Sequence, residues 1–209
     1  MLGTLTERSN GSEDKRRLIL KAAVRVFARK GYHTCRVGDI AAEAGVSHGL
    51  LYHYFRSKED VLETIFGETW GRLVDEIARL EAADLATVDK LRAIARFYLG
   101  SWATGPDLIR VLVREVARSP EVGRRVDAGA HVFLGIRRIL EAGQARGDIR
   151  RDADPRLTTW VVYGALEEIL TGWVLGTLPE GEDELAAAER TVVEIVCGGL
   201  APDRAPATA

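Results

Sequence analysis

The residues from Ser47 to Lys58 have side chains of the types that bind DNA. Hydroxyl, imidazole and phenol groups form hydrogen bonds with base edges, and an ammonium group pairs with phosphates. No acidic residue occurs between Gly45 and Lys58, so nothing in this stretch repels a phosphate. We predict contacts with base edges from Ser47, His48, Gly49 and Tyr52, and contacts with phosphates from Tyr54 and Lys58.

Two short helices are predicted to position these side chains. Val37, Ile40, Ala41 and Ala44 recur at helical spacing and form one apolar face. Gly45 then permits a tight turn, which Val46 can fill, and Ser47 is a plausible N-cap for the second helix. That helix, from about 48 to 55, would bury Leu50, Leu51, Tyr54 and Phe55 and expose His48, Gly49, Tyr52 and His53. Helix, glycine turn and helix is the arrangement that places the second helix in a DNA major groove.

Further helices are predicted on both sides of this pair. An apolar stripe from Leu18 to Phe27 predicts a supporting helix that starts near Ser12 and ends at Gly31. Ser57 is a plausible N-cap for the helix that follows, with Asp60 in the acidic position of a capping box. These helices would complete a small three-helix DNA-binding domain and continue into the rest of the chain.

The string AGVSHGLLYHYFRSKEDVL, residues 44–62, resembles the DNA-binding motif of the TetR family of bacterial transcriptional regulators. The likeness extends upstream through GYHTCRVGDIA, which makes it far more specific than a bare helix-turn-helix. It implies an all-α fold with an N-terminal helix-turn-helix domain and a C-terminal helical bundle that binds an effector and dimerises. The DNA-binding candidates are Arg36, Val46, Ser47, His48, Gly49, Tyr52, His53, Tyr54 and Lys58.

The chain departs from the family pattern just before Val37. Family members usually have Thr or Ser at the position of Arg36 or Cys35, where a hydroxyl caps the helix and contacts a phosphate. Arg36 either replaces that contact as a cation or is a solvated surface residue. Thr34 is a candidate cap one residue early.

Composition indicates a globular protein. Its 209 residues are 46% hydrophobic, and no apolar run approaches the ~20 residues of a membrane span. The N-terminus lacks a signal-peptide core, so we expect a cytoplasmic protein. Cys35 and Cys197 have no partners at metal-binding spacing, and no nucleophile, phosphate loop or paired carboxylates suggest catalysis. We therefore expect no enzyme activity, metal or cofactor; an all-α enzyme and a pure scaffold are the alternatives.

The sequence predicts two domains. We expect a disordered tail over 1–12, the helix-turn-helix domain over 13–57, a ligand-binding and dimerisation domain over 58–199, and a C-terminal tail over 200–209. The second domain would begin with a connecting helix over 58–81, followed by helices over about 85–102, 108–117, 119–147, 156–176 and 183–197. No strand pattern of useful length occurs, so the prediction is all-α with roughly nine helices.

The helices over 158–176 and 185–197 are the candidates for self-association. The resemblance implies that they pair with those of a second subunit as a four-helix interface, whereas a monomer would use them internally. A helix-turn-helix protein normally needs two copies to bind a palindrome, which favours the dimer. The interface candidates are Val161, Gly164, Ala165, Glu168, Gly172, Val192 and Ile195.

Aromatic side chains concentrate in the second domain, either as core or as the lining of an effector pocket. The stretch YGALEEILTGWVLG, residues 163–176, resembles the fatty-acid-degradation repressors of the family, which implies long-chain acyl-CoA as effector. A drug-like, steroid or aromatic effector is the alternative. The pocket candidates are Trp70, Phe97, Trp102, Phe133, Arg137, Trp160, Tyr163 and Glu167. The predicted protein is thus a dimeric regulator, expected to repress, that leaves a palindromic operator when a small apolar effector binds.

Overall fold

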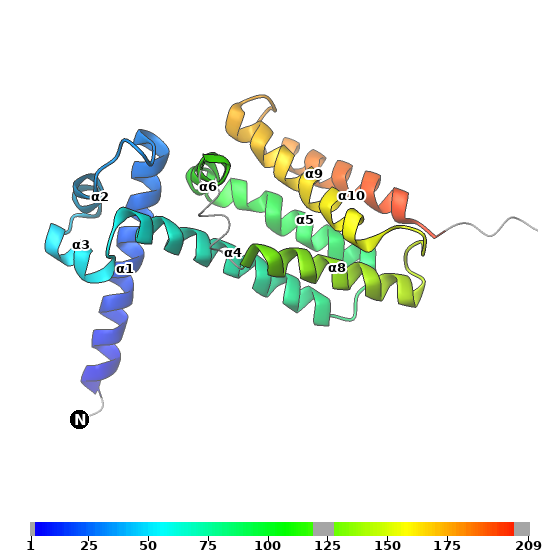
Figure 1. The fold of residues 1–209 in the computed structure, drawn as a ribbon, viewed down its shortest axis with the longest axis horizontal. Coiled ribbons are helices and arrows are strands. Elements are labelled where there is room, and N and C mark those ends of the chain that lie inside the picture. Colours follow the sequence, from blue (N-terminus) through cyan, green and yellow to red (C-terminus); the bar gives the residue numbers. More distant parts are fainter. Residues whose placement is uncertain (1–2, 119–127, 203–209) are drawn as a thin grey trace, which may run out of the picture. The chain divides into compact units, whose positions relative to one another are not determined.

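The structure, a computed structural model, describes residues 3–118 and 128–202. These ranges contain nine helices and no strand (Figure 1). The helices are α1 (Gly3–Lys30), α2 (Val37–Ala44), α3 (His48–Tyr54), α4 (Lys58–Ala82), α5 (Thr87–Thr104), α6 (Pro106–Arg118), α8 (Ala128–Arg146), α9 (Pro155–Leu175) and α10 (Glu182–Leu200). The predicted all-α fold, a helix-turn-helix domain followed by a helical domain, is confirmed.

Some helix boundaries differ from the prediction. α1 begins at Gly3, so the predicted helix start near Ser12 and the predicted disordered tail over 1–12 are corrected. No proline interrupts this segment, and a helix anchored by a packed C-terminal half gains one hydrogen bond for each residue added. α10 continues to Leu200 instead of ending near 197. The predicted helix start at 119–120 and most of the predicted tail lie outside the described residues.

The chain divides into two compact units. The first comprises Met1–Glu68 and Arg110–Val126, and the second comprises Thr69–Ile109 and Asp127–Ala209. α4 and α6 therefore contribute residues to both units. The first unit extends past the predicted domain boundary at residue 57, because the first turns of α4 supply Val61, Leu62 and Phe66 to its core.

The core of the first unit forms where α1, α2, α3 and the start of α4 meet. Ile19, Val26 and Ile40 are fully buried, and Leu51 on α3 is fully buried as well. Ion pairs on the surface link α1 to α2, with Arg25 and Arg29 on Glu43 and Lys30 on Asp39. These hydrogen-bonded cations lower the pKa of both carboxyls, but the pairs are solvent-exposed and each contributes little stability.

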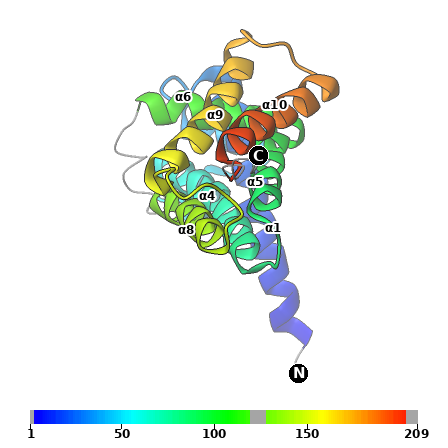
Figure 2. The same ribbon diagram turned by 90° about the vertical axis from the view of Figure 1, so that its right-hand side faces the viewer.

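The second unit is a bundle of α5, α8, α9 and α10 with the C-terminal part of α4. α10 packs on α5 and α9, and α9 packs on α8, as Figure 2 shows in end view. Leu99, Ile136 and Leu140 are fully buried at its centre. The absence of a side chain at Gly143 lets α8 approach Thr87, since a Cβ there would collide with the Thr87 hydroxyl oxygen. Among the described residues, no helix is long and apolar enough to cross a membrane.

Candidate DNA-binding surface and effector site

The turn between α2 and α3 forms as the sequence predicts. Gly45 adopts the left-handed conformation, with φ 64° and ψ 33°. The amide of Val46 donates to the carbonyl of Ala41 at 3.0 Å, and the Ser47 hydroxyl accepts a hydrogen bond from the amide of Leu50 at 3.2 Å. The predicted glycine turn and the Ser47 N-cap are both confirmed, and together they fix where α3 begins.

α3 exposes the side chains that the sequence predicts to face outward. His48, Gly49, Tyr52 and His53 are exposed, while Leu51 and Phe55 are buried. Leu50 and Tyr54 are only half-buried, so the buried face is narrower than predicted. The predicted orientation of α3 is therefore confirmed for its exposed face, and contact of these residues with DNA stays a prediction.

A polar cleft adjoins this surface. It has a volume of about 310 Å³, and its lining includes Tyr52, His53 and Tyr54 together with Arg16 and Arg56. The guanidinium of Arg16 lies 5.8 Å from the ring centre of Phe55 and pairs with Glu68. The cleft thus places two arginines that were not predicted as DNA contacts beside three residues that were.

The ammonium of Lys58 forms most of its hydrogen bonds within the protein. Its ammonium donates to the carbonyl of Tyr32 at 2.7 Å and to that of Cys35 at 3.2 Å, and it lies 4.4 Å from the ring centre of Tyr32. Burial and a hydrogen bond to Glu59 raise the pKa of the Tyr32 phenol. Because an ammonium has three N–H groups, only one remains for the predicted contact with a phosphate.

The start of α2 is capped from within the helix. Asp39 accepts a hydrogen bond from the amide of Arg36 at 2.9 Å, and the Arg36 side chain is exposed. The Thr34 hydroxyl instead donates to the carbonyl of Lys30 at the end of α1, so its predicted role as a cap of α2 is wrong. At α4, Ser57 accepts from the amide of Asp60 at 3.2 Å, which confirms that N-cap.

Four of the predicted pocket residues come together in the second unit. Tyr163 on α9 stacks with Trp70 at a ring-centre distance of 6.2 Å and packs against Phe133 at 4.8 Å. Phe133 in turn lies 4.4 Å from Trp160. The structure therefore assembles an aromatic cluster, defined as Trp70, Phe133, Trp160 and Tyr163, from α4, α8 and α9.

A polar group adjoins this aromatic cluster. The Tyr98 hydroxyl donates to Oε2 of Glu167, and the Tyr163 hydroxyl lies 3.3 Å from the same oxygen. Burial, reinforced by the nearby carboxylate, raises the pKa of both phenols, so they remain protonated donors. Tyr98 was not among the predicted pocket residues, because its position on an apolar helix face is equally typical of core.

Three predicted pocket residues lie elsewhere. Trp102 pairs with Trp173 at a ring-centre distance of 6.0 Å and is almost fully buried. Phe97 is 40% exposed, and Arg137 is exposed and paired with Glu141 one turn later on α8.

An apolar stripe runs along the exposed face of α9. Leu157, Val161 and Leu175 are 56%, 61% and 67% exposed, and Gly164 and Glu168 lie between them at heptad spacing. On α10, Ile195 is 71% exposed. Large apolar side chains exposed in this number along adjacent helices are typical of an interface.

Two of the predicted interface residues are buried within the chain itself. A Cβ on Gly172 would lie 2.7 Å from Cδ1 of Leu178, so Leu178 of the same chain already occupies that space. Val192 is 7% exposed and belongs to the protomer core. The prediction is corrected at these two positions, since helical spacing alone does not show which side of a helix faces its own bundle.

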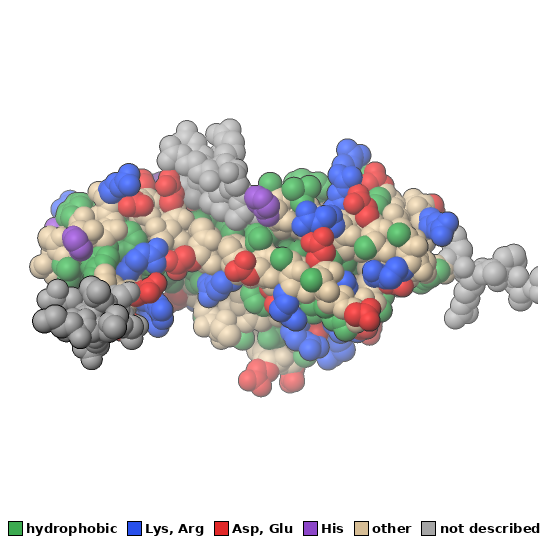
Figure 3. All heavy atoms as spheres, turned by 90° about the horizontal axis from the view of Figure 1, so that it is seen from below, with side chains coloured by type: hydrophobic (Ala, Val, Ile, Leu, Met, Phe, Trp, Pro, Cys, Tyr) green, Lys and Arg blue, Asp and Glu red, His purple; other side chains and the backbone are tan. Residues whose placement is uncertain are grey.

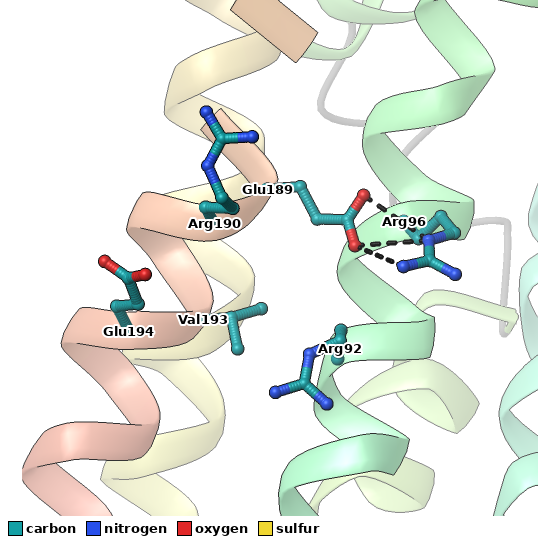
Figure 4. A pocket seen from close by; sticks show the side chains of 6 residues that line it. All are labelled: Arg92, Arg96, Glu189, Arg190, Val193 and Glu194. Atoms are coloured by element: carbon teal, nitrogen blue, oxygen red, sulfur yellow. Dashed lines mark hydrogen bonds and ion pairs between the residues drawn. The ribbon is translucent and has the colours of Figure 1, made fainter. Parts of the chain in front are cut away.

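A charged groove of about 290 Å³ lies on the outer side of α5 and α10 (Figure 4). Arg92, Arg96, Glu189, Arg190, Val193 and Glu194 line it. Arg96 and Glu189 form an ion pair of 2.9 Å across the groove. None of the predicted effector residues lines this groove. Acidic and basic side chains are interspersed over the face in Figure 3, without a broad basic coat.

Comparison with known proteins identifies the family. The family model described as "Bacterial regulatory proteins, tetR family" matches residues 19–65, and the model "Tetracyclin repressor-like, C-terminal domain" matches residues 84–200, more than half of the chain. The chain belongs to the TetR family. It is therefore a DNA-binding transcriptional regulator, and the predicted family is confirmed.

Within the TetR family, the chain is similar to regulators of fatty acid metabolism. The "Fatty acid metabolism regulator protein" of Bacillus subtilis is 29% identical over 87% of this chain and 93% of its own length. The structure of the fatty acid degradation regulator FadR from Bacillus halodurans is 31% identical over 89% of this chain and 96% of that chain, with a TM-score of 0.80. FadR from Bacillus subtilis, solved with stearoyl-CoA, is 28% identical over 88% and 98%, with a TM-score of 0.79.

Proposed function

We propose that this TetR-family regulator is a cytoplasmic homodimeric repressor that binds a palindromic operator and is released from it by long-chain acyl-CoA. The likeness to FadR in complex with stearoyl-CoA, over 88% of this chain, carries the choice of effector. The residues of the second unit support it, because the aromatic cluster offers apolar surface, with Trp160 61% exposed, and Glu167 with two phenols offers polar groups that can orient a ligand.

The homodimer is supported by the exposed stripe on α9. A monomer would leave Leu157, Val161 and Leu175 in water, whereas a second copy would bury them. Two DNA-binding domains held about one DNA turn (~34 Å) apart can contact two half-sites of a palindrome. We accordingly assign the proposed interface to Val161, Gly164, Ala165, Glu168 and Ile195.

Signal transfer requires helices that belong to both units. α4 extends from the first turns packed in the DNA-binding domain to Trp70 of the aromatic cluster and beyond. On α6, the almost fully buried Glu115 places Oε2 3.5 Å from Nε2 of His33. An effector that binds one arrangement of these helices better than another shifts the population between them, and about 1.4 kcal/mol of coupling changes operator affinity tenfold.

The proposed effector class is tested by tryptophan fluorescence. Acyl-CoAs of graded chain length are titrated into the purified protein, with free CoA as control. We expect a saturable change for long chains and none for free CoA, because the binding free energy comes from burial of the acyl chain. Replacing both tryptophans of the aromatic cluster, Trp70→Phe with Trp160→Phe, should remove most of the change. Trp102→Phe, in the pair with Trp173, should retain it.

No saturable change with any chain length would contradict acyl-CoA as effector. The search would then turn to drug-like, steroid and aromatic ligands, which the same apolar cluster can accommodate. A change that persists in the double variant of Trp70→Phe and Trp160→Phe and disappears in Trp102→Phe would instead place the ligand near the Trp102–Trp173 pair.

A further inference from the structure

The imidazole of His48 packs directly against the backbone of Gly38 on α2. A Cβ on Gly38 would lie 2.8 Å from Nε2 of His48, which is closer than a real Cβ approaches a neighbouring atom, and 3.4 Å from its Cε1. The atoms that block the space are the far end of a side chain, not backbone. A larger residue at position 38 would therefore displace the His48 ring and leave the helices in place.

Backbone conformation does not explain the glycine at position 38. Gly38 is the second residue of α2, and it is not among the glycines with positive φ. Alanine has a higher helix propensity than glycine in such a position. We therefore attribute the glycine at position 38 to the space that its missing Cβ leaves, which the His48 ring occupies.

Tyr52 confines the same ring from another side. It lies one helical turn after His48 on α3, and the two ring centres are 6.3 Å apart with an interplanar angle of 61°. Both side chains are on the exposed face that is predicted to meet base edges. The His48 ring thus has a defined orientation on that face before any DNA is bound.

We propose that Gly38 is a specificity-determining positioning residue, which sets base preference at one base pair of each half-site by fixing the orientation of His48. The packing turns the edge with Nε2 and Cε1 toward α2, so Nδ1 is the ring nitrogen left for a base edge. We assign no phosphate contact to this ring, so only sequence preference is expected to depend on the glycine. The inference rests on the predicted base contact of His48 and is independent of the effector.

The test is selection of binding sites from a pool of random DNA duplexes, with the full-length protein and its Gly38→Ala, His48→Ala and doubly substituted variants. We expect Gly38→Ala and His48→Ala to lose preference at the same base pair, by roughly 5- to 100-fold in relative affinity. The double variant should match His48→Ala alone, because the glycine acts only through the histidine. His48→Asn, which retains a polar atom near the position of Nδ1 but does not reach α2, should make Gly38→Ala silent.

A matched control separates positioning from folding. Gly67→Ala adds the same methyl group to a helix of the same unit where nothing lies within 4 Å, and it should leave base preference unchanged. Gly38→Ala should melt at the same temperature as the unsubstituted protein or higher. Uniform weakening on all sequences, or an effect of Gly38→Ala that persists without His48, would overturn the proposal. An unchanged preference in His48→Ala would overturn it too, by removing the base contact on which it rests.

Discussion

Val161→Arg is expected to convert the homodimer to monomers and to weaken operator binding by more than about 100-fold. The substitution places one cation per subunit within the apolar stripe on α9, where burial of a charge costs several kcal/mol per ion. A monomer contacts only one half-site, so it loses the contribution of the second DNA-binding domain. Sedimentation measures the mass, and electrophoretic mobility of a selected duplex measures the affinity.

Leu134→Arg is the matched control for the interface. Leu134 is 47% exposed on α8 and is not one of the stripe residues, so the same change of side chain should leave both mass and affinity unaltered. A Val161→Arg protein that stays dimeric with full operator affinity would show that the subunits associate through another surface.

The second large effect is expected from Leu51→Ala, which should abolish DNA binding while effector binding and dimerisation remain. Leu51, on α3, is fully buried in the core of the first unit. Truncation of a buried leucine costs about 2–5 kcal/mol, a large share of the stability of so small a unit. Leu50→Ala, on the half-buried neighbour, should cost less and retain binding.

Thermal unfolding and the tryptophan titration distinguish the two units in this variant. All four tryptophans, from Trp70 to Trp173, belong to the second unit. The fluorescence response to acyl-CoA should therefore survive the loss of DNA binding. Loss of DNA binding and of the fluorescence response together would mean that the two units unfold as one.

The local pattern of the chain predicts the DNA-binding domain well. Three local signals predict the bounds of α2 and α3 to within a residue or two of those observed. They are the glycine of the tight turn, the serine in the N-cap position and the narrow apolar face. Each of these signals acts within one turn or one short helix, so no knowledge of the remaining fold is needed. The start of α1 was missed because residues 3–12 carry no strong helix signal, and helix growth from the packed end determines their conformation.

Contacts between distant residues could not be predicted in the same way. The spacing of Gly172 and Val192 indicates a helix face but not that Leu178 and the protomer core cover it. The position of Lys58 in the sequence motif predicts a contact with a phosphate. In the structure, however, two carbonyls of the loop before α2 accept hydrogen bonds from its ammonium. Tyr98 and Glu167 are 69 residues apart, so their hydrogen bond is evident only once α5 packs on α9.

The most direct test of the proposed function is operator affinity with and without effector. A duplex selected for tight binding is titrated with the protein in the presence of stearoyl-CoA, octanoyl-CoA or free CoA. Each compound is used at the concentration that saturates its fluorescence response. A compound that gives no fluorescence response is used at the concentration chosen for stearoyl-CoA. We expect stearoyl-CoA to raise the Kd for the duplex at least about tenfold, which corresponds to about 1.4 kcal/mol of coupling, and free CoA to leave it unchanged. An unchanged Kd at saturating stearoyl-CoA would contradict an acyl-CoA-released repressor.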